Sequence, residues 1–475
     1  MSTEEPRHPS GTPDDGRPVA SVSIAKGRPV LASDDAAAEA FRRNSPRKRR
    51  HFPPEPKTWR DAGFDHAAAE ALVLRHLLNA RSMTGRVLSD ATCLDLGLVQ
   101  DALESLKDKK LVVRRGTTVM GDFVNELTDA GREKALQSRS ITHYVGPAPV
   151  PWHHYLQHLE AQSVRALSPT MEDLQRAFAD LQVSDELYDQ LGPAITSGRA
   201  LFLHGEPGNG KTSLAERMTR CFGGEVWLPY TLDIGGHYVK LFDPAVHRPV
   251  EVDAKTKEQQ DRRWVLVERP TLVAGGELSL PMLEIQHDPT TNTAEAPLQL
   301  KANLGTFVVD DFGRGVTAPR DLLNRWIYPL ERGLDFLSLP DGRKFSSPFD
   351  CVLVFSTNLE PRDLADEAFL RRIPYKIHVG DPTEDEFEAL VVHEARQMGI
   401  QLPERSVHYL LERHYRLHGR PMRFCHPRDL LQQVRHLCDF ERREATAGPK
   451  EWDRVVGNYF GHYGPPRGAT PLSPR

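Results

Sequence analysis

The sequence has no apolar run long enough to cross a membrane, since its longest runs fall well short of the roughly 18 residues that a spanning helix needs. Its first residues, MSTEEPRHPS, also lack the basic and then apolar pattern of a signal peptide. We therefore expect a protein without a membrane span, located in the cytoplasm.

The sequence also has few cysteines and a small net charge. The 475 residues contain five cysteines and no CxxC pair, which is typical of reduced thiols in a cytosolic protein. Lys and Arg number 61 against 66 Asp and Glu, so the net charge of −5 gives no general attraction to nucleic acid or anionic lipid. The His- and Cys-rich stretch between His408 and Cys438 matches no standard zinc-ligand spacing, and a zinc site there is the less favoured interpretation.

Three segments are predicted to lie outside the folded domains. Residues 1–57 are rich in Pro, Ser, Gly and Arg and cannot bury enough surface to offset the entropy of ordering, so we expect a disordered tail. The last residues, 464–475, are expected to be disordered as well. Residues 139–170 contain the stiff run GPAPVP and are predicted to be a linker.

Residues 58–138 carry the pattern of a small compact domain. The order of predicted elements, three helices, two strands and a last helix, resembles a winged helix. Thr128 or Asp129 is predicted to cap the last helix. The helices are expected at 67–78, 86–92, 98–106 and from 129, the strands at 111–113 and near 126, and a turn at 114–116.

The predicted recognition helix of this domain is not a basic one. Its three lysines, at 107, 109 and 110, are offset by acidic residues at 101, 104 and 108. A DNA reader normally presents a basic face, because neutralising phosphates supplies much of its affinity. We therefore favour protein docking over nucleic-acid binding for this domain.

From about residue 171, helices alternate with short apolar strands, which predicts a parallel α/β sheet. The buried-strand candidate ALFLH, residues 200–204, leads into a complete GxxxxGK[ST] motif, and a helix is predicted to follow at 213–222. The motif consists of Gly205, Glu206, Pro207, Gly208, Asn209, Gly210, Lys211, Thr212 and Ser213.

This motif predicts a phosphate-binding loop. Its glycines let successive backbone N–H groups point at phosphate oxygens, and the positive end of the next helix faces the same anion. Lys211 is expected to contact the β- and γ-phosphates of ATP, and the Thr212 hydroxyl is expected to bind Mg²⁺. An ordinary Gly-rich turn is the alternative, but the flanking strand and helix disfavour it.

Two further strands end in polar residues. The strand at 305–309 runs into Asp310 and Asp311, a Walker B arrangement in which Asp310 would hold Mg²⁺ and Asp311 would orient the attacking water. The strand at 351–356 is followed by Asn358, whose amide can reach both the γ-phosphate and that water. Together these residues predict an ATP-hydrolysing site.

The ordered set of these motifs, with Phe-Leu-Arg-Arg at 369–372 and His-Pro-Arg-Asp-Leu at 426–430, resembles the AAA+ ATPases over roughly residues 171–445. The resemblance implies an α/β P-loop NTPase core at 171–380 and a C-terminal helical lid at 381–463, next to the N-terminal winged helix. It also implies a ring of subunits. In it Asn358 is sensor 1, Arg371 or Arg372 is the arginine finger, and Arg428 is sensor 2.

The sequence departs from the family pattern in two places. Walker B usually reads Asp-Glu, whereas Asp311 is one methylene shorter, so hydrolysis is expected to be slow or to use a repositioned water. The stretch between Lys211 and Asp310 is also long, and we expect a β-rich insertion at 225–300. Within it, GGHYV at 235–239 is either a pore loop that grips a polypeptide or a hairpin turn.

The whole chain is also similar to a narrower bacterial group, winged-helix-containing AAA+ ATPases described as having chaperone activity associated with Flp pilus assembly. The phrases that carry this resemblance are YVGPAPVP at 144–151, the P-loop, and FDPAVH at 242–247. The resemblance implies a link to pilus or secretion assembly.

We therefore expect an AAA+ ATPase that assembles with itself into a ring, expected to be a hexamer, and uses ATP and Mg²⁺ to remodel an unknown protein substrate. The first alternative is a DNA-associated ATPase or ATP-dependent transcription regulator that acts through the winged helix. The second is a nucleotide-gated scaffold that binds ATP and barely hydrolyses it. A basic recognition face would favour the first alternative, and a misplaced Asp311 would favour the second.

Overall fold

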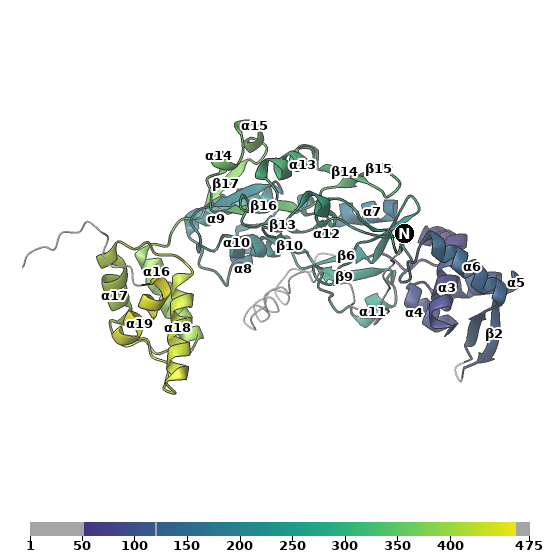
Figure 1. Ribbon diagram of the computed structural model, residues 1–475, viewed down its shortest axis with the longest axis horizontal. Helices are drawn as coiled ribbons and strands as arrows, with labels where there is room; N and C mark the ends of the chain where they lie inside the picture. Colours follow the sequence, from purple (N-terminus) through teal and green to yellow (C-terminus); the bar gives the residue numbers. More distant parts are fainter. Residues whose placement is uncertain (1–51, 119–120, 462–475) are drawn as a thin grey trace, which may run out of the picture. The chain divides into compact units, whose positions relative to one another are not determined.

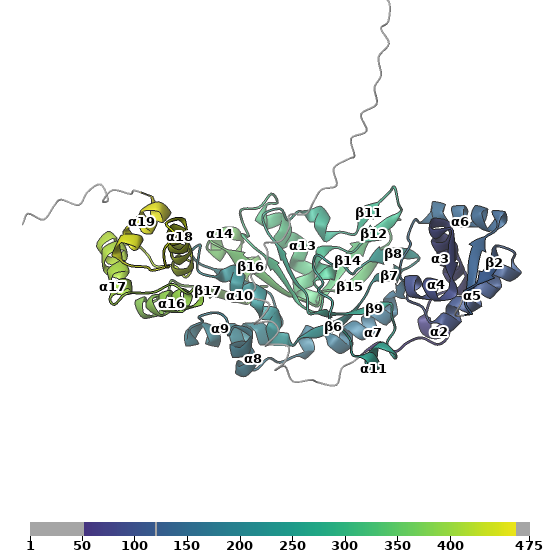
Figure 2. The same ribbon diagram turned by 90° about the horizontal axis from the view of Figure 1, so that it is seen from below.

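A computed structural model describes residues 52–118 and 121–461 (Figures 1 and 2). The predicted disordered stretches therefore lie mostly outside the described residues. The predicted end of the first tail at residue 57 is wrong. The Glu55 N–H donates to the Gln259 carbonyl at 2.8 Å, and the Asp261 N–H donates to the Pro53 carbonyl at 2.8 Å. Phe52 packs against a hydrophobic cluster, so this short segment does bury apolar surface.

The N-terminal domain contains the predicted elements and two more, the short helix α2 and the strand β1. Its three strands form an antiparallel sheet in the order β1-β3-β2. The expected turn at 114–116 is wrong, because β2 continues through it with an irregularity between Arg114 and Gly116. Thr128 caps α6 by accepting from the Gly131 N–H at 3.0 Å. The elements are α2 (Trp59–Ala62), α3 (His66–Ala80), β1 (Ser82–Thr84), α4 (Gly85–Thr92), α5 (Leu96–Asp108), β2 (Val112–Thr117), β3 (Phe123–Leu127) and α6 (Asp129–Ile141).

The predicted linker at 139–170 is largely ordered structure. Strand β4 (Val150–Pro151) pairs in parallel with β7 (Thr231–Ile234), and helix α7 (Trp152–Gln162) follows at once. Tyr155 and Leu159 of this helix are buried in the same cluster as the β-rich region. The proline run is thus only the entry to a helix whose apolar side chains, four residues apart, share one face.

The core is a five-stranded parallel sheet in the order β10-β13-β16-β5-β17. Every residue of β13 and β16 is buried, as expected for parallel strands covered on both faces. The strands are β5 (Leu201–His204), β10 (Thr271–Ala274), β13 (Thr306–Val309), β16 (Val352–Thr357) and β17 (Tyr375–His378).

Helices cover the two faces of this sheet (Figure 1). Leu201 and Leu203 of β5 face a cluster built with α8, α9 and α10, whereas Phe202 between them faces the cluster that contains Trp326 of α13. This period of two fixes which face each side chain serves. The helices are α8 (Met171–Ala177), α9 (Asp185–Thr196), α10 (Lys211–Arg217) with the 3-10 helix η2 (Met218–Phe222), and α13 (Pro319–Arg332).

The β-rich insertion is narrower than predicted, because β10 lies inside 225–300 and belongs to the core sheet. The rest forms a two-stranded sheet, β6 with β9, and a mixed sheet in the order β11-β12-β8-β7-β4. These elements are β6 (Glu225–Pro229), β8 (His237–Lys240), α11 (Ala254–Lys257), β9 (Trp264–Glu268), η3 (Leu280–Leu283), β11 (Gln286–Asp288), β12 (Thr293–Glu295) and α12 (Leu298–Lys301).

The segment GGHYV is a hairpin turn. Gly235 and Gly236 have φ of 61° and 90°, and the flanking strands β7 and β8 pair in register from Thr231 with Lys240. Two such residues between strands are typical of the tight turns that suit β-hairpins. Tyr238 packs edge-on against Tyr144, with ring centroids 5.5 Å apart, so its ring is not free to grip a polypeptide.

After α13 the chain forms the hairpin β14 (Leu334–Ser338) and β15 (Lys344–Pro348), and the short helices α14 (Pro361–Leu364) and α15 (Glu367–Leu370) follow β16. The lid then contains four grouped helices (Figure 2) around the fully buried Trp452. They are α16 (Glu384–Gln397), α17 (Ser406–Leu410), α18 (His426–Phe440) and α19 (Pro449–Phe460), with the short turns η4 (Leu411–Tyr415) and η5 (Arg416–His418) between α17 and α18. Within the described ranges, no helix combines the length and apolar character needed to cross a membrane.

Candidate functional site

The P-loop connects β5 to α10, and its three glycines all have positive φ. Gly205, Gly208 and Gly210 have φ of 138°, 87° and 79°, values that L side chains rarely adopt. A Cβ atom at Gly205 would also lie 2.4 Å from the Val379 carbonyl oxygen, and one at Gly208 would lie 2.6 Å from Cys425 Sγ. The loop conformation therefore depends on glycine both for its dihedral angles and for its space.

Lys211 lies in the first turn of α10 and is 6% exposed. Its ammonium donates to the carbonyls of Gly205 and Glu206 at 3.0 and 2.9 Å and to Asn358 Oδ1 at 2.7 Å. Burial lowers the pKa of Lys211, and the nearby carboxylates of Asp310 and Asp311 oppose that shift. The loop thus holds a desolvated cation on its inner side.

Thr212 of α10 lies next to Asp310, which directly follows β13. The Thr212 hydroxyl donates to Asp310 Oδ1 at 2.9 Å and lies 3.0 Å from Oδ2. A hydroxyl and a carboxylate are the oxygen ligands that Mg²⁺ takes beside substrate phosphates, so the donor set fits this ion. In the part of the chain that the structure describes, no group of three or more His, Cys, Asp or Glu side chains could hold a metal, and this part includes the His- and Cys-rich stretch between His408 and Cys438.

Asn358 connects the buried lysine to the second Walker B acid. Its Oδ1 accepts from Lys211, and its Nδ2 lies 3.4 Å from Asp311 Oδ1. Asp311 is exposed and has φ of 49°. This left-handed conformation is one that Asp and Asn visit more readily than most residues. The two adjacent carboxylates therefore have different neighbours: Asp310 contacts Thr212, and Asp311 lies beside Asn358.

The two arginines after α15 differ in their surroundings. Arg372 donates from Nε to Glu331 Oε1 of α13 at 2.5 Å. Arg371 is exposed, and its guanidinium has no hydrogen bond or ion pair with any residue within 52–118 or 121–461.

Arg428 lies in the first turn of α18 and is exposed, while its neighbours His426 and Pro427 are buried. This helix begins beside the P-loop, because the Cys425 N–H donates to the Gly208 carbonyl at 2.9 Å. The sensor-2 role of Arg428 stays a prediction. The helix begins at His426, and this start turns Arg428 toward solvent.

Arg423, which the sequence motifs did not single out, is the lid arginine that contacts the P-loop. Its Nη2 donates to Glu206 Oε2 at 3.2 Å, and its Nη1 pairs with Asp381 Oδ1. The same Asp381 oxygen accepts from Asn209 Nδ2 at 2.7 Å. Arg423 and Asp381 lie in segments without regular secondary structure, and neither belongs to a recognised motif. Their position close to the predicted lid helices was the one signal in the sequence that could have indicated them.

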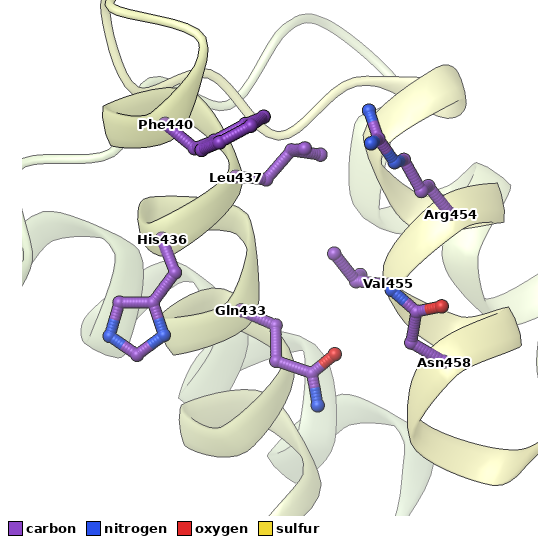
Figure 3. A pocket seen from close by; sticks show the side chains of 7 residues that line it. All are labelled: Gln433, His436, Leu437, Phe440, Arg454, Val455 and Asn458. Atoms are coloured by element: carbon purple, nitrogen blue, oxygen red, sulfur yellow. The ribbon is translucent and has the colours of Figure 1, made fainter.

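The lid also carries a surface pocket of about 270 Å³ between α18 and α19 (Figure 3). The ring of Phe440 at its edge is 82% exposed. None of the predicted site residues lines this pocket. Its lining residues are Gln433, His436, Leu437, Phe440, Arg454, Val455 and Asn458.

Comparisons with known proteins match parts of the chain. Residues 383–458, the lid, match a domain of unknown function, DUF8689. A search of curated protein sequences found no match.

Among solved structures, NtrX from Brucella abortus is 12% identical at a TM-score of 0.37, over 60% of this chain and 58% of that one. The chain thus spans less than two thirds of NtrX. Two variants of RuvB from Thermotoga maritima are 14% and 13% identical at TM-scores of 0.35 and 0.34, over 60% and 62% of this chain and 73% and 72% of theirs. These TM-scores are too low to support the site. The site is supported by the geometry of the P-loop and of the parallel strands around it.

Proposed function

We propose that the protein is an AAA+ ATPase that binds and hydrolyses ATP with Mg²⁺ and uses the turnover to remodel a protein assembly. The observation that carries the proposal is the chain of contacts from Lys211 through Asn358 to Asp311, beside the Thr212–Asp310 pair. Nucleotide-hydrolysing P-loop proteins need these groups together, because catalysis of phosphoryl transfer consists mainly of positioning and charge stabilisation.

Each residue has a defined task in this proposal. The P-loop N–H groups and Lys211 would receive the phosphates, and the Asn358 amide would contact both the terminal phosphate and a water. Asp311 accepts a hydrogen bond from that water and aligns it for attack. Mg²⁺, held by Thr212 and Asp310, would neutralise charge that develops on the phosphate oxygens.

The assembly is proposed to be a cytoplasmic ring, expected to be a hexamer, in which Arg371 acts on the nucleotide of the neighbouring subunit. Arg371 is exposed and unpaired among the described residues, whereas Arg372 is held by Glu331. An arginine that serves a neighbour must be free at the surface of its own subunit. The chaperone-like role and the link to pilus or secretion assembly remain part of this proposal and are supported by the sequence resemblance alone.

The direct test replaces Asp311 with asparagine, which removes the charge but tolerates the same left-handed backbone. We expect ATP affinity to stay within about twofold and steady-state phosphate release to fall by about 10²–10⁴-fold, the usual contribution of a positioned acid or base. Calorimetry measures the first quantity and a coupled phosphate assay the second. If the wild type and Asp311→Asn hydrolyse ATP at the same rate, Asp311 has no part in the mechanism.

We favour a protein partner over DNA for the N-terminal domain, which we propose is a winged helix. Lys107 and Arg114 both pair with Glu104, Lys109 pairs with Glu70, and Arg115 lies 3.4 Å from Glu126. These carboxylates compete with phosphates for those four cations.

The matching prediction is that the full chain binds duplex DNA only non-specifically at physiological salt. Fluorescence anisotropy with a pool of random duplexes and with any enriched sequence measures this. A sequence-selective complex that is at least about 10³-fold tighter than the random pool would favour the DNA-associated alternative.

A further inference from the structure

The turn that follows strand β13 is held by the end of strand β16. The regular pairing of the two strands ends at Val309 and Phe355. Beyond that point, the Phe312 N–H donates to the Ser356 carbonyl at 2.8 Å, and the Phe312 carbonyl accepts from the Thr357 hydroxyl at 2.7 Å. Both backbone groups of Phe312 are therefore fixed by the last two residues of β16.

The Thr357 hydroxyl makes a second hydrogen bond, on the other side of the sensor-1 asparagine. It accepts from the Leu359 N–H at 3.1 Å. Asn358 lies between these two residues, so one hydroxyl joins the turn after Asp311 to the segment that carries Asn358. Thr357 is 1% exposed. Its side chain lies inside the protein and can act on a bound nucleotide through its neighbours.

The turn that carries Asp311 needs contacts of this kind. Asp311 and Gly313, on either side of Phe312, have φ of 49° and 105°. The Arg314 N–H donates to the Asp311 carbonyl at 3.0 Å, which closes a turn of four residues. A non-glycine residue in the left-handed region persists only where its surroundings hold it there. The bonds to Phe312, in the middle of the turn, are such contacts.

The proposed chemistry depends on where the Asp311 carboxylate lies relative to the Asn358 amide. Asn358 Nδ2 lies 3.4 Å from Asp311 Oδ1, and a water aligned for attack must be within reach of both side chains. A misplacement of about 1 Å in such a site can reduce the rate about 10²-fold. Aspartate also has one side-chain torsion fewer than glutamate, so the position of its carboxylate follows the backbone more closely.

From these contacts we propose that Thr357 is a positioning residue of the hydrolytic site, whose hydroxyl sets the position of Asp311 relative to Asn358. It does so by holding the Phe312 carbonyl and the Leu359 N–H in place. The proposal depends on the proposed function, because it needs the hydrolysis of ATP. Loss of the hydroxyl should slow hydrolysis and spare ATP binding, since the P-loop still receives the phosphates.

The test compares Thr357→Val with Thr357→Ser in the full-length protein. Valine keeps the branched shape but offers no hydrogen bond to Phe312 or Leu359, whereas serine keeps the hydroxyl. We expect Thr357→Val to lower kcat about 10- to 100-fold while the Kd for ATP stays within about twofold, and Thr357→Ser to keep roughly the wild-type kcat. Phosphate release at saturating ATP and calorimetry measure the two quantities. Equal losses in both variants would overturn the proposal.

Thr306→Val is the matched control. Thr306 is fully buried in β13, and its hydroxyl has no hydrogen-bond partner among the described residues. The same change of side chain there should leave ATP turnover unchanged. If Thr306→Val lowers turnover as much as Thr357→Val does, the loss reflects any change of a buried threonine in this sheet, and the proposal is wrong.

A double-variant cycle separates positioning from general destabilisation. In an Asp311→Asn background, Thr357→Val should lower kcat by no more than about twofold further, because the group that it positions is already disabled. A variant that is merely destabilised would lose the same factor in both backgrounds, and this result would contradict the proposal. Thermal melts establish that each protein is folded at the assay temperature.

The same experiments distinguish this inference from the proposed function. If the wild-type protein hydrolyses no ATP, both are wrong. If its turnover depends on Asp311 and Thr357→Val hydrolyses ATP at the wild-type rate, the proposed function stands and the positioning role of Thr357 is overturned.

Discussion

Replacing Lys211 with alanine is expected to abolish ATP binding. Lys211 is the only side-chain cation within the P-loop motif, and its ammonium already lies among the loop carbonyls and Asn358. Without it the β- and γ-phosphates lose their main charge partner in a part-buried site, where charge-assisted hydrogen bonds contribute most. Titration calorimetry with ATP and Mg²⁺ measures the loss.

The matched control is Lys255→Ala, which removes a lysine from the exposed helix α11. It should bind ATP as the wild type does. Because Lys211 also contributes to the loop's own hydrogen bonds, circular dichroism should confirm that the variant is folded. An unchanged affinity in a folded Lys211→Ala protein would remove the site assignment and the proposed function with it.

Replacing Arg371 with alanine is expected to leave ATP binding intact and to reduce hydrolysis by a large factor. An arginine that enters a neighbour's site contributes on the order of 10³–10⁵ in rate in well-studied NTPases. Arg372→Ala is the informative comparison, since Arg372 is held by Glu331 and its loss should reduce thermal stability more than turnover. If Arg372→Ala loses turnover and Arg371→Ala does not, Arg372 is the arginine finger.

A mixture of two inactive proteins tests whether the site is shared. Arg371→Ala keeps its own Asp311, and Asp311→Asn keeps its own finger, so some interfaces in a mixed ring join an intact finger to an intact site. We expect the mixture to hydrolyse more ATP than the sum of the two proteins measured alone. If light scattering shows mixed rings and no activity returns, the finger or the ring itself is wrongly assigned.

The core of the site could be predicted because its residues follow buried strands. Lys211, Asp310 and Asn358 each lie just after a short apolar run, and the carboxyl ends of parallel strands meet at one edge of the sheet. The structure brings these three together as their positions implied. The left-handed backbone of Asp311 could not be read from the sequence, since Asp occurs readily in many conformations.

The errors come from contacts between distant parts of the chain. Strand β10 looked like part of an insertion because its partner, β13, lies far along the sequence and no local pattern marks the pairing. Helix α7 was not predicted, because the proline run directly before it indicated an extended linker. Arg423 and Asp381 belong to no periodic element, and only the fold places them against the P-loop.

The strand order has a consequence for how the protein is made on the ribosome. Among the strands of the described residues, β5, which leads into the P-loop, pairs only with β16 and β17, and both of these are synthesised long after it. During translation β5 therefore waits with both of its edges unpaired, while β10 and β13 can already pair with each other. An apolar strand in that condition is a template for wrong pairing. The nascent chain thus carries an unpaired apolar strand next to the P-loop until β16 and β17 have been synthesised.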